Sequence, residues 1–302
     1  MGSPARAATL APMSDPDPRE IDDDGFAAVE RSAWIDGRAS AVELDMLARE
    51  EPLEIRVNQV AIAVVMRTPG DDEELVRGFL LSERIVAGVD DIASMRHCDN
   101  VETPEAEDNV MLVRLDPSVQ VDLAALRRNM YASSSCGVCG KASIEAAMAL
   151  PELAQLCDAP GPQLRVNVET LTSLPARLRA QQLVFDRTGG LHGAGLFDAD
   201  GQPWVVREDV GRHNAVDKVF GWAARERVDF SRCVLMVSGR VSFEIVQKAL
   251  ALGIPIVAAV SAPTSLAVEL AREAGISLVA FVRDRRLCVY AGEHRIVAAP
   301  TS

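Results

Sequence analysis

The stretch between residues 233 and 282 alternates short apolar segments with longer amphipathic ones. The apolar segments read CVLMVSG, PIVAAVS and ISLVAFV, and the segments between them read SFEIVQKALALG and SLAVELAREAG. Short apolar runs separated by helical segments of about ten residues are typical of successive strand–helix units. Such units pack as a layered α/β sheet. The pattern therefore predicts an α/β domain over residues 163–302.

Other segments of this domain have weaker signals. A helix is expected over 214–227 and a last strand over 286–296. Between residues 183 and 209, glycine-containing turns at 188–190 and 200–201 predict short strands joined by tight turns. These elements would extend the same sheet.

The first part of the chain has a different composition. Residues 1–30 are rich in Asp, Pro and Ala, and we expect a disordered acidic tail there. A small α+β N-terminal domain is predicted over 31–130, and a cysteine loop with a connecting helix over 131–162. The expected elements of the N-terminal domain are two strands over 53–66, a helix after the acidic run at 71–74, and strands at 92–97 and 109–115.

Charge and composition exclude several classes of protein. The net charge of −13 argues against non-specific nucleic-acid binding, which requires a basic surface. No apolar run reaches the ~18 residues of a membrane span, and the N-terminus has no apolar core of signal-peptide length. Six cysteines among 302 residues do not resemble a secreted disulfide scaffold. We therefore expect a cytoplasmic protein with no nucleic-acid or membrane partner.

The cysteine pair in SSSCGVCGK, Cys136 and Cys139, admits three interpretations. A structural zinc site needs four ligands, whereas this pair supplies two and the four histidines are scattered. A thioredoxin-like dithiol fits the composition, but such a motif follows the first strand of a βαβ unit and not a run of serines in mid-chain. The third interpretation is a nucleophilic thiolate on a loop of small residues.

A nearby helix start and Lys141 favour the thiolate. Unpaired backbone N–H groups at a helix start and a neighbouring ammonium group both lower a thiol pKa from about 8.5. A thiolate attacks sulfur readily, and a loop of small residues could present it to two partners in turn. The residues favour sulfur relay and leave the redox dithiol open.

Polar turns follow three successive units of the predicted α/β sheet. Ligands bind beyond the carboxyl ends of strands in such sheets, and the helix N-termini there suit phosphate. The residues in these turns predict an anionic ligand that carries phosphates, although His213 or Asn214 could instead cap a helix. The candidate contacts are Arg212, His213, Asn214, Lys218, Arg240, Ser261 and Thr264.

Eight segments together resemble the formate dehydrogenase accessory sulfurtransferases, the FdhD family. They are EEPLEIRVN, MRTPGDDEELVRGFLLSERIV, SSCGVCGK, FDRTGGLHGAGLF, REDVGRHNAVDKV, SGRVSFEIVQKA, SAPTSLAVELA and FVRDRR, and the resemblance runs from about residue 50 to about 296. It implies a sulfurtransferase that takes persulfide sulfur from a cysteine desulfurase. The sulfur then passes to the molybdenum bis(molybdopterin guanine dinucleotide) cofactor before that cofactor enters the formate dehydrogenase apoenzyme.

The resemblance also implies roles for particular residues. Cys136 would carry the persulfide and Cys139 would assist it. The segment Phe281, Val282, Arg283, Asp284, Arg285 and Arg286 would help to bind the molybdenum cofactor, which is a bound substrate and not a resident catalytic metal. Without the family, a solvated edge turn is the alternative interpretation of the same segment. The second half would have a cytidine-deaminase-like α/β/α architecture.

Deaminase chemistry is not expected despite that fold. A zinc deaminase needs H-x-E followed downstream by P-C-x-x-C. Here the third position of the motif, counted from His192, is Ala194 and not Glu, and the cysteine pair lies upstream of the histidine. Two other functions stay open: a redox dithiol protein and a cofactor-binding chaperone without chemistry. A homodimer is compatible with an α/β sheet.

Overall fold

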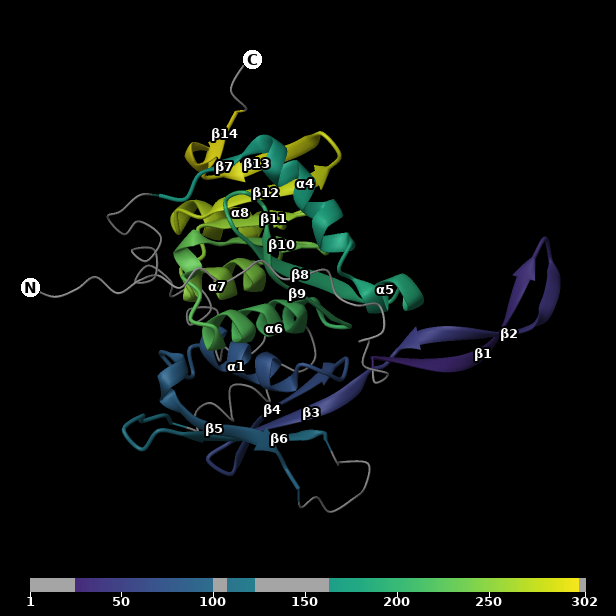
Figure 1. Ribbon diagram of the computed structural model, residues 1–302, viewed down its shortest axis with the longest axis horizontal. Coiled ribbons are helices and arrows are strands. Elements are labelled where there is room, and N and C mark those ends of the chain that lie inside the picture. Colours follow the sequence, from purple (N-terminus) through teal and green to yellow (C-terminus); the bar gives the residue numbers. More distant parts are fainter. Residues whose placement is uncertain (1–24, 100–107, 123–162, 299–302) are drawn as a thin grey trace, which may run out of the picture.

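The computed structural model describes residues 25–99, 108–122 and 163–298 (Figure 1). Cys136, Cys139 and the predicted connecting helix lie outside the described residues, as does most of the predicted tail. The predicted α/β class is confirmed, with one large mixed sheet, a smaller four-stranded sheet and helices around both.

The large sheet has six strands in the order β13-β12-β11-β10-β8-β9. Its members are β8 (His192–Phe197), β9 (Pro203–Asp209), β10 (Val234–Val237), β11 (Ile256–Ala259), β12 (Ser277–Arg283) and β13 (Arg286–Ala291). Strands β10, β11 and β12 run parallel, as the alternating pattern predicts. Strands β8, β9 and β13 join them antiparallel to their neighbours.

Helices cover both faces of this sheet. Leu235 and Val237 point into a core shared with three helices, while Val234 and Met236 point into a second core shared with α4. Because side chains alternate along a strand, this arrangement explains why the strands read as continuous apolar runs. The helices are α4 (Val168–Arg179) on one face, and α6 (Arg212–Arg225), α7 (Phe243–Ala251) and α8 (Ser265–Glu273) on the other.

The N-terminal part forms a four-stranded sheet in the order β4-β3-β6-β5, with one helix on it. Its elements are β3 (Glu51–Val57), β4 (Val60–Arg67), α1 (Asp72–Ser82), β5 (Ile92–His97) and β6 (Val110–Leu115). All four expected strands and the helix are present. Helix α1 lies between this sheet and α6, so it joins the two sheets into one packed body (Figure 1).

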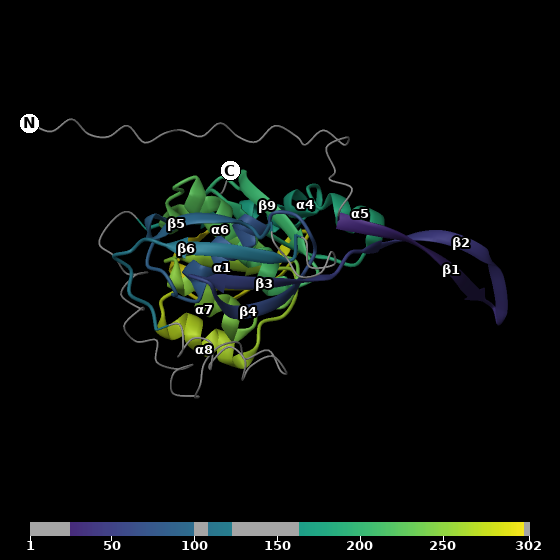
Figure 2. The same ribbon diagram turned by 90° about the horizontal axis from the view of Figure 1, so that it is seen from below.

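A two-stranded ribbon projects from this body (Figures 1 and 2). It consists of β1 (Phe26–Ile35) and β2 (Arg38–Ala48), and we call it the arm. Residues 26–30 were expected in the disordered tail, and that expectation is wrong. Phe26 is buried beneath the guanidinium of Arg187, and this contact anchors the start of β1.

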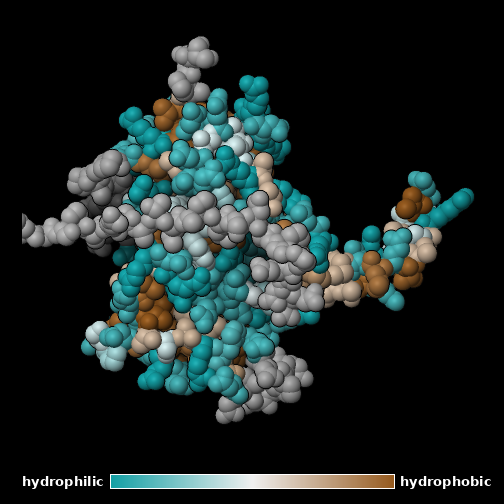
Figure 3. Space-filling view, in the orientation of Figure 1, coloured by the Kyte–Doolittle hydropathy of each residue, from teal (hydrophilic) through white to brown (hydrophobic). Residues whose placement is uncertain are grey.

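The arm exposes several large apolar side chains, visible as brown atoms in Figure 3. Trp34 is 73% exposed and Leu44 is 74% exposed. A two-stranded ribbon has no second layer to cover its faces, so these side chains remain in contact with water.

Two predictions in the second half need correction. Residues 183–188 form helix α5 (Leu183–Thr188) and not a strand, because the Glu208 carboxylate accepts the N–H groups of Val184 and Phe185 and Gly189 ends the helix in a left-handed conformation. The strand expected over 286–296 ends at Ala291, because Gly292 turns the chain with φ 65°.

Shorter elements complete the fold. Strands β7 (Val166–Asn167) and β14 (Ile296–Val297) pair with each other. The described residues also form the 3-10 turns η2 (Val89–Asp91), η5 (Phe230–Arg232) and η6 (Glu293–Arg295). No helix in the described ranges is long and apolar enough to cross a membrane.

Candidate functional site

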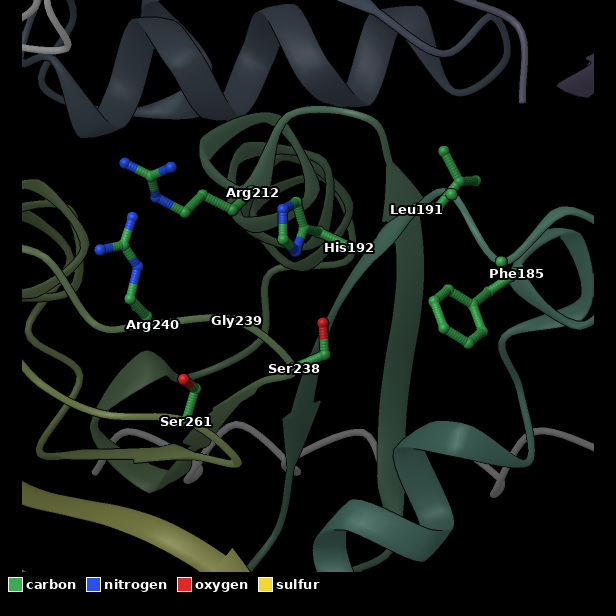
Figure 4. A pocket seen from close by; sticks show the side chains of 10 residues that line it. Phe185, Leu191, His192, Arg212, Ser238, Gly239, Arg240 and Ser261 are labelled. Atoms are coloured by element: carbon green, nitrogen blue, oxygen red, sulfur yellow. The ribbon is translucent and has the colours of Figure 1, made fainter. Parts of the chain in front are cut away.

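A pocket of about 570 Å³ opens at one edge of the six-stranded sheet (Figure 4). Its walls come from the end of α5, the start of β8, the start of α6, and the loops after β10 and β11. The lining residues are Phe185, Gly189, Gly190, Leu191, His192, Arg212, Ser238, Gly239, Arg240 and Ser261.

The strand directions explain why these residues meet. Strands β10 and β11 are parallel, so the loops that follow them, with Ser238 and Ser261, emerge at the same edge. Strand β8 runs antiparallel to β10 and therefore begins there, at His192. Strand β9 runs antiparallel to β8 and ends there, and α6 begins three residues later at Arg212.

Ser238 and Gly239 close the loop after β10 against β8. The Ser238 hydroxyl accepts the N–H of Gly193 at 2.9 Å, and the Ser238 N–H donates to the Gly193 carbonyl at 2.9 Å. A Cβ on Gly239 would lie 3.3 Å from Nδ1 of His192. Glycine therefore permits the close approach of this loop to the imidazole.

Two arginines on one side of the pocket have N–H groups that no acceptor among the described residues occupies. The Nε of Arg212 is buried and has no hydrogen-bond partner among the described residues. Arg240 is exposed, and no ion pair within the described ranges engages it. Figure 4 shows both guanidinium groups on the same side of the pocket, above the Ser261 hydroxyl. A buried guanidinium N–H without an acceptor is the group that a phosphate or carboxylate oxygen satisfies.

His192 is neutral near pH 7 in this setting. Burial lowers its pKa, and the positive charge of Arg212 and the neighbouring His213 lower it further, while Asp209 opposes them. The imidazole therefore offers the pocket one donor and one acceptor.

The opposite side of the pocket is apolar. Phe185 and Leu191 lie across from the arginines in Figure 4. The Glu208 carboxylate fixes the first turn of α5, which carries Phe185, by accepting two backbone N–H groups at 2.9 Å each. Burial raises the pKa of Glu208. The pocket thus combines a cationic side with a flat apolar side.

Three predicted contacts, Arg212, Arg240 and Ser261, line this pocket. His213 lies beside it, and its Nε2 is 2.8 Å from the Glu244 carboxylate and 3.3 Å from the Ser242 hydroxyl.

Three others do not reach the pocket. Lys218 is fully buried and bonds to Asp209 at 2.9 Å and to the Thr68 carbonyl at 3.0 Å. Asn214 donates to Asp209 at 2.9 Å, and Thr264 caps α8 by accepting the N–H of Ala267. These three side chains hold turns and helix ends. The helix cap that the sequence left open for His213 or Asn214 is not formed by either residue, because the N-cap of α6 is Gly211.

The segment Phe281–Arg286 lies at the end of β12 and the turn to β13. Its link to the pocket is the Phe281 N–H, which donates to the carbonyl of Ser261 at 3.2 Å. Phe281 has φ 53°, a left-handed conformation that is uncommon for an aromatic residue. The side chains of residues 283–286 are exposed.

Several pocket residues were missed by the sequence analysis. Ser238 and Gly239 belong to the same predicted polar turn as Arg240, but only Arg240 was selected from it as a ligand contact. Phe185, Leu191 and His192 enter through the antiparallel strand β8 and helix α5, and the chain order alone does not indicate that they lie beside β10.

Three cysteines lie in the described residues, and they differ in burial. Cys233 is buried, and burial raises its pKa to about 12. Cys98 and Cys288 are half-buried. In the described part of the chain, no three His, Cys, Asp or Glu side chains are grouped as metal ligands.

The fold and pocket define an α/β protein with an arginine-lined pocket at a sheet edge, and comparison with known sequences gives its family. The sequence model of the FdhD/NarQ family matches residues 48–297. The chain belongs to that family.

Named relatives agree with this assignment, and a solved structure shares the fold. The chain is 51% identical over 254 residues to the sulfur carrier protein FdhD of Streptomyces avermitilis, covering 83% of this chain and 89% of that protein. It is 50% identical over 257 residues to the FdhD of Mycobacterium tuberculosis, covering 83% and 92%. The fold matches a crystal structure of a formate dehydrogenase accessory protein from Desulfotalea psychrophila with a TM-score of 0.69 and 24% identity, over 90% of this chain and 99% of that one.

Proposed function

We propose that this protein is a sulfurtransferase for the maturation of formate dehydrogenase. It would receive persulfide sulfur from a cysteine desulfurase on Cys136. It would then pass that sulfur to the molybdenum bis(molybdopterin guanine dinucleotide) cofactor, bound as a substrate. Family membership and the name sulfur carrier protein, borne by its relatives, support the sulfur step.

The pocket is the observation that supports the cofactor step. Its unpartnered Arg212 Nε, Arg240 and the serine hydroxyls suit phosphate oxygens, and Phe185 with Leu191 suits a flat ring. A guanine dinucleotide carries both features. We propose that the phosphates face the arginines and that a guanine or pterin ring lies against the apolar side.

The sulfur chemistry follows from thiol exchange. The Cys136 thiolate attacks the terminal sulfur of the desulfurase persulfide, so a new S–S bond forms on Cys136 and the desulfurase thiolate leaves. In the second step the Cys139 thiolate attacks Sγ of Cys136, which releases the outer sulfur as sulfide and leaves a Cys136–Cys139 disulfide. A dithiol reductant reopens that disulfide.

Other parts of the proposal rest on the same family. The formate dehydrogenase apoenzyme is the proposed client, the cytoplasm is the proposed location, and the large sheet is proposed to be cytidine-deaminase-like.

A homodimer also stays a prediction. The exposed apolar side chains of the arm favour it, and sedimentation analysis would decide it.

Complementation tests the proposed function. In a strain that lacks its own copy, the wild-type gene should restore formate dehydrogenase activity, and Cys136→Ala should not. Cys288→Ala, a half-buried cysteine outside the motif, is the matched control and should restore activity. Restoration by Cys136→Ala would instead support a chaperone without sulfur chemistry.

A further inference from the structure

Thr68 lies in the N-terminal part of the chain but bonds directly to the turn that leads into the pocket. It is 3% exposed, between β4 and α1. Its N–H donates to the Asp209 carboxylate at 3.2 Å, and its hydroxyl accepts the N–H of Val210 at 3.1 Å. Its carbonyl accepts the Lys218 ammonium group at 3.0 Å. One residue therefore makes three bonds to a segment 141 or more positions away.

The turn between β9 and α6 determines the position of Arg212. Asp209 is completely buried and accepts the N–H of Gly211 at 2.8 Å as well as the Asn214 amide. Gly211 is the N-cap of α6, and Arg212 is the first residue of that helix. The direction of the Arg212 side chain thus depends on a turn whose backbone is held by Thr68 and Asp209.

The Thr68 hydroxyl also bonds in the other direction. It donates to the carbonyl of Arg49 at 3.0 Å, and the Arg49 N–H donates to the carbonyl of Gly25 at 3.0 Å. Residues 25 and 49 flank the base of the arm. The hydroxyl therefore bridges the base of the arm and the pocket turn, using both its donor and an acceptor lone pair.

We propose that Thr68 is a positioning residue for the pocket and that the N-terminal part of the chain thereby completes the binding site. The hydroxyl fixes Val210 and Asp209, which place Arg212 beside His192. The nucleotide as ligand rests on the proposed function, whereas the placement of Arg212 does not.

His192 reports the position of Arg212 independently of any ligand. Burial lowers the His192 pKa first, and the Arg212 charge lowers it further. The other groups that act on this imidazole are His213, itself paired with Glu244, and Asp209. If Arg212 moves away, the pKa of His192 rises toward the ordinary histidine value of about 6.5. A merely stabilising role for Thr68 would leave this pKa unchanged.

The test uses the full-length protein and three variants. Thr68→Val removes the hydroxyl and keeps the shape, and Thr68→Ser restores a hydroxyl. Thr172→Val is the matched control, because the Thr172 hydroxyl bonds only within α4, to the Glu169 carbonyl. The His192 pKa is measured by NMR titration and GDP affinity by calorimetry, and thermal unfolding confirms that each variant is folded. If Thr68→Val does not fold, Thr68→Cys is used in its place, because the thiol is similar in size to the hydroxyl and is a weaker acceptor.

We expect Thr68→Val to raise the His192 pKa and to weaken GDP binding about fivefold, because a displaced Arg212 loses part of its interaction with phosphate. Thr68→Ser and Thr172→Val should resemble the wild type. A folded Thr68→Val with an unchanged His192 pKa would overturn the positioning role. A raised pKa in a protein whose wild type does not bind GDP would support the positioning role and count against the proposed ligand.

Discussion

Gly78 on α1 and Gly221 on α6 bring the two helices into backbone contact. A Cβ on Gly78 would lie 1.8 Å from the carbonyl oxygen of Asp217, and a Cβ on Gly221 would lie 1.8 Å from that of Glu74. No side chain larger than hydrogen fits at this crossing. At this crossing the N-terminal part of the chain packs against α6, which covers one face of the large sheet.

Substituting either glycine should loosen that crossing. Gly78→Ala or Gly221→Ala forces the helices apart, and we expect a loss of about 1–3 kcal/mol in the free energy of unfolding, as for overpacked cores. Urea denaturation measures this loss in the free energy of unfolding. Gly88→Ala is the control, since a Cβ there meets nothing within 4 Å and its φ of −155° suits any residue. Equal stability of Gly78→Ala and Gly88→Ala would contradict the close crossing.

Lys248 is a second anchor of the same interface. Its ammonium group, buried beneath α1, lies 2.9 Å from Asp217, 2.8 Å from Glu83 and 2.8 Å from the Ser82 hydroxyl. Lys248→Met would leave Asp217 buried without its partner, which costs about 3–5 kcal/mol. Exchanging both residues, as Asp217→Leu with Lys248→Met, should recover part of that loss in thermal or urea unfolding. A double variant less stable than Lys248→Met would argue against the pairing.

The stability that Lys248 contributes through its ion pairs changes with pH in a definite direction. Burial alone would lower the Lys248 pKa, but the Asp217 and Glu83 carboxylates outweigh it and raise the pKa above its ordinary value. A raised lysine pKa contributes stability in full below about pH 10, and that stability is lost as pH rises through the folded value. The difference in stability between the wild type and the double variant Asp217→Leu with Lys248→Met, which has no unpaired Asp217 to titrate, should therefore be constant from about pH 7 to 9.

The pocket arginines should dominate nucleotide binding. Arg212→Gln removes charge-assisted hydrogen bonds of about 1.5–3 kcal/mol and should weaken GDP binding about tenfold or more in calorimetry. Arg240→Gln should weaken it less, because Arg240 is exposed and its charge is screened by solvent. Arg114→Gln, an exposed arginine on β6, keeps the same change in net charge and should bind GDP as the wild type does. Equal losses in all three variants would point to overall charge and not to this pocket.

A separate prediction concerns the segment Phe281–Arg286. Arg283 and Arg286 are exposed, so their interaction with a phosphate is screened by solvent. The double variant Arg283→Gln/Arg286→Gln should weaken GDP binding severalfold, less than Arg212→Gln does. Unchanged affinity in the double variant would remove this segment from the binding site.

The sequence predicted regular elements better than it predicted the pocket. Strands β10 to β12 and their helices follow from local alternation, so they were predictable. Helix α4 was not predicted, because Pro175 interrupts its pattern although Asn167 caps it. His192 and Phe185 reach the pocket only through antiparallel pairing of β8 with β10, which depends on contacts across the sheet. Lys218 has the chemistry of a ligand contact, but its burial against Asp209 is a tertiary feature.

The central claim is that Cys136 carries sulfur, and intact-protein mass spectrometry tests it most directly. The purified protein would be incubated with a cysteine desulfurase and L-cysteine, beside Cys136→Ala, Cys139→Ala and the control Cys233→Ala. Cys233 is a suitable control because burial raises its pKa to about 12 and keeps it from acting as a thiolate. We expect one or more added sulfur masses in the wild type and in Cys233→Ala, and none in Cys136→Ala. Absence of added sulfur from the wild type, with an active desulfurase, would contradict the account and return the cysteine pair to redox or metal chemistry.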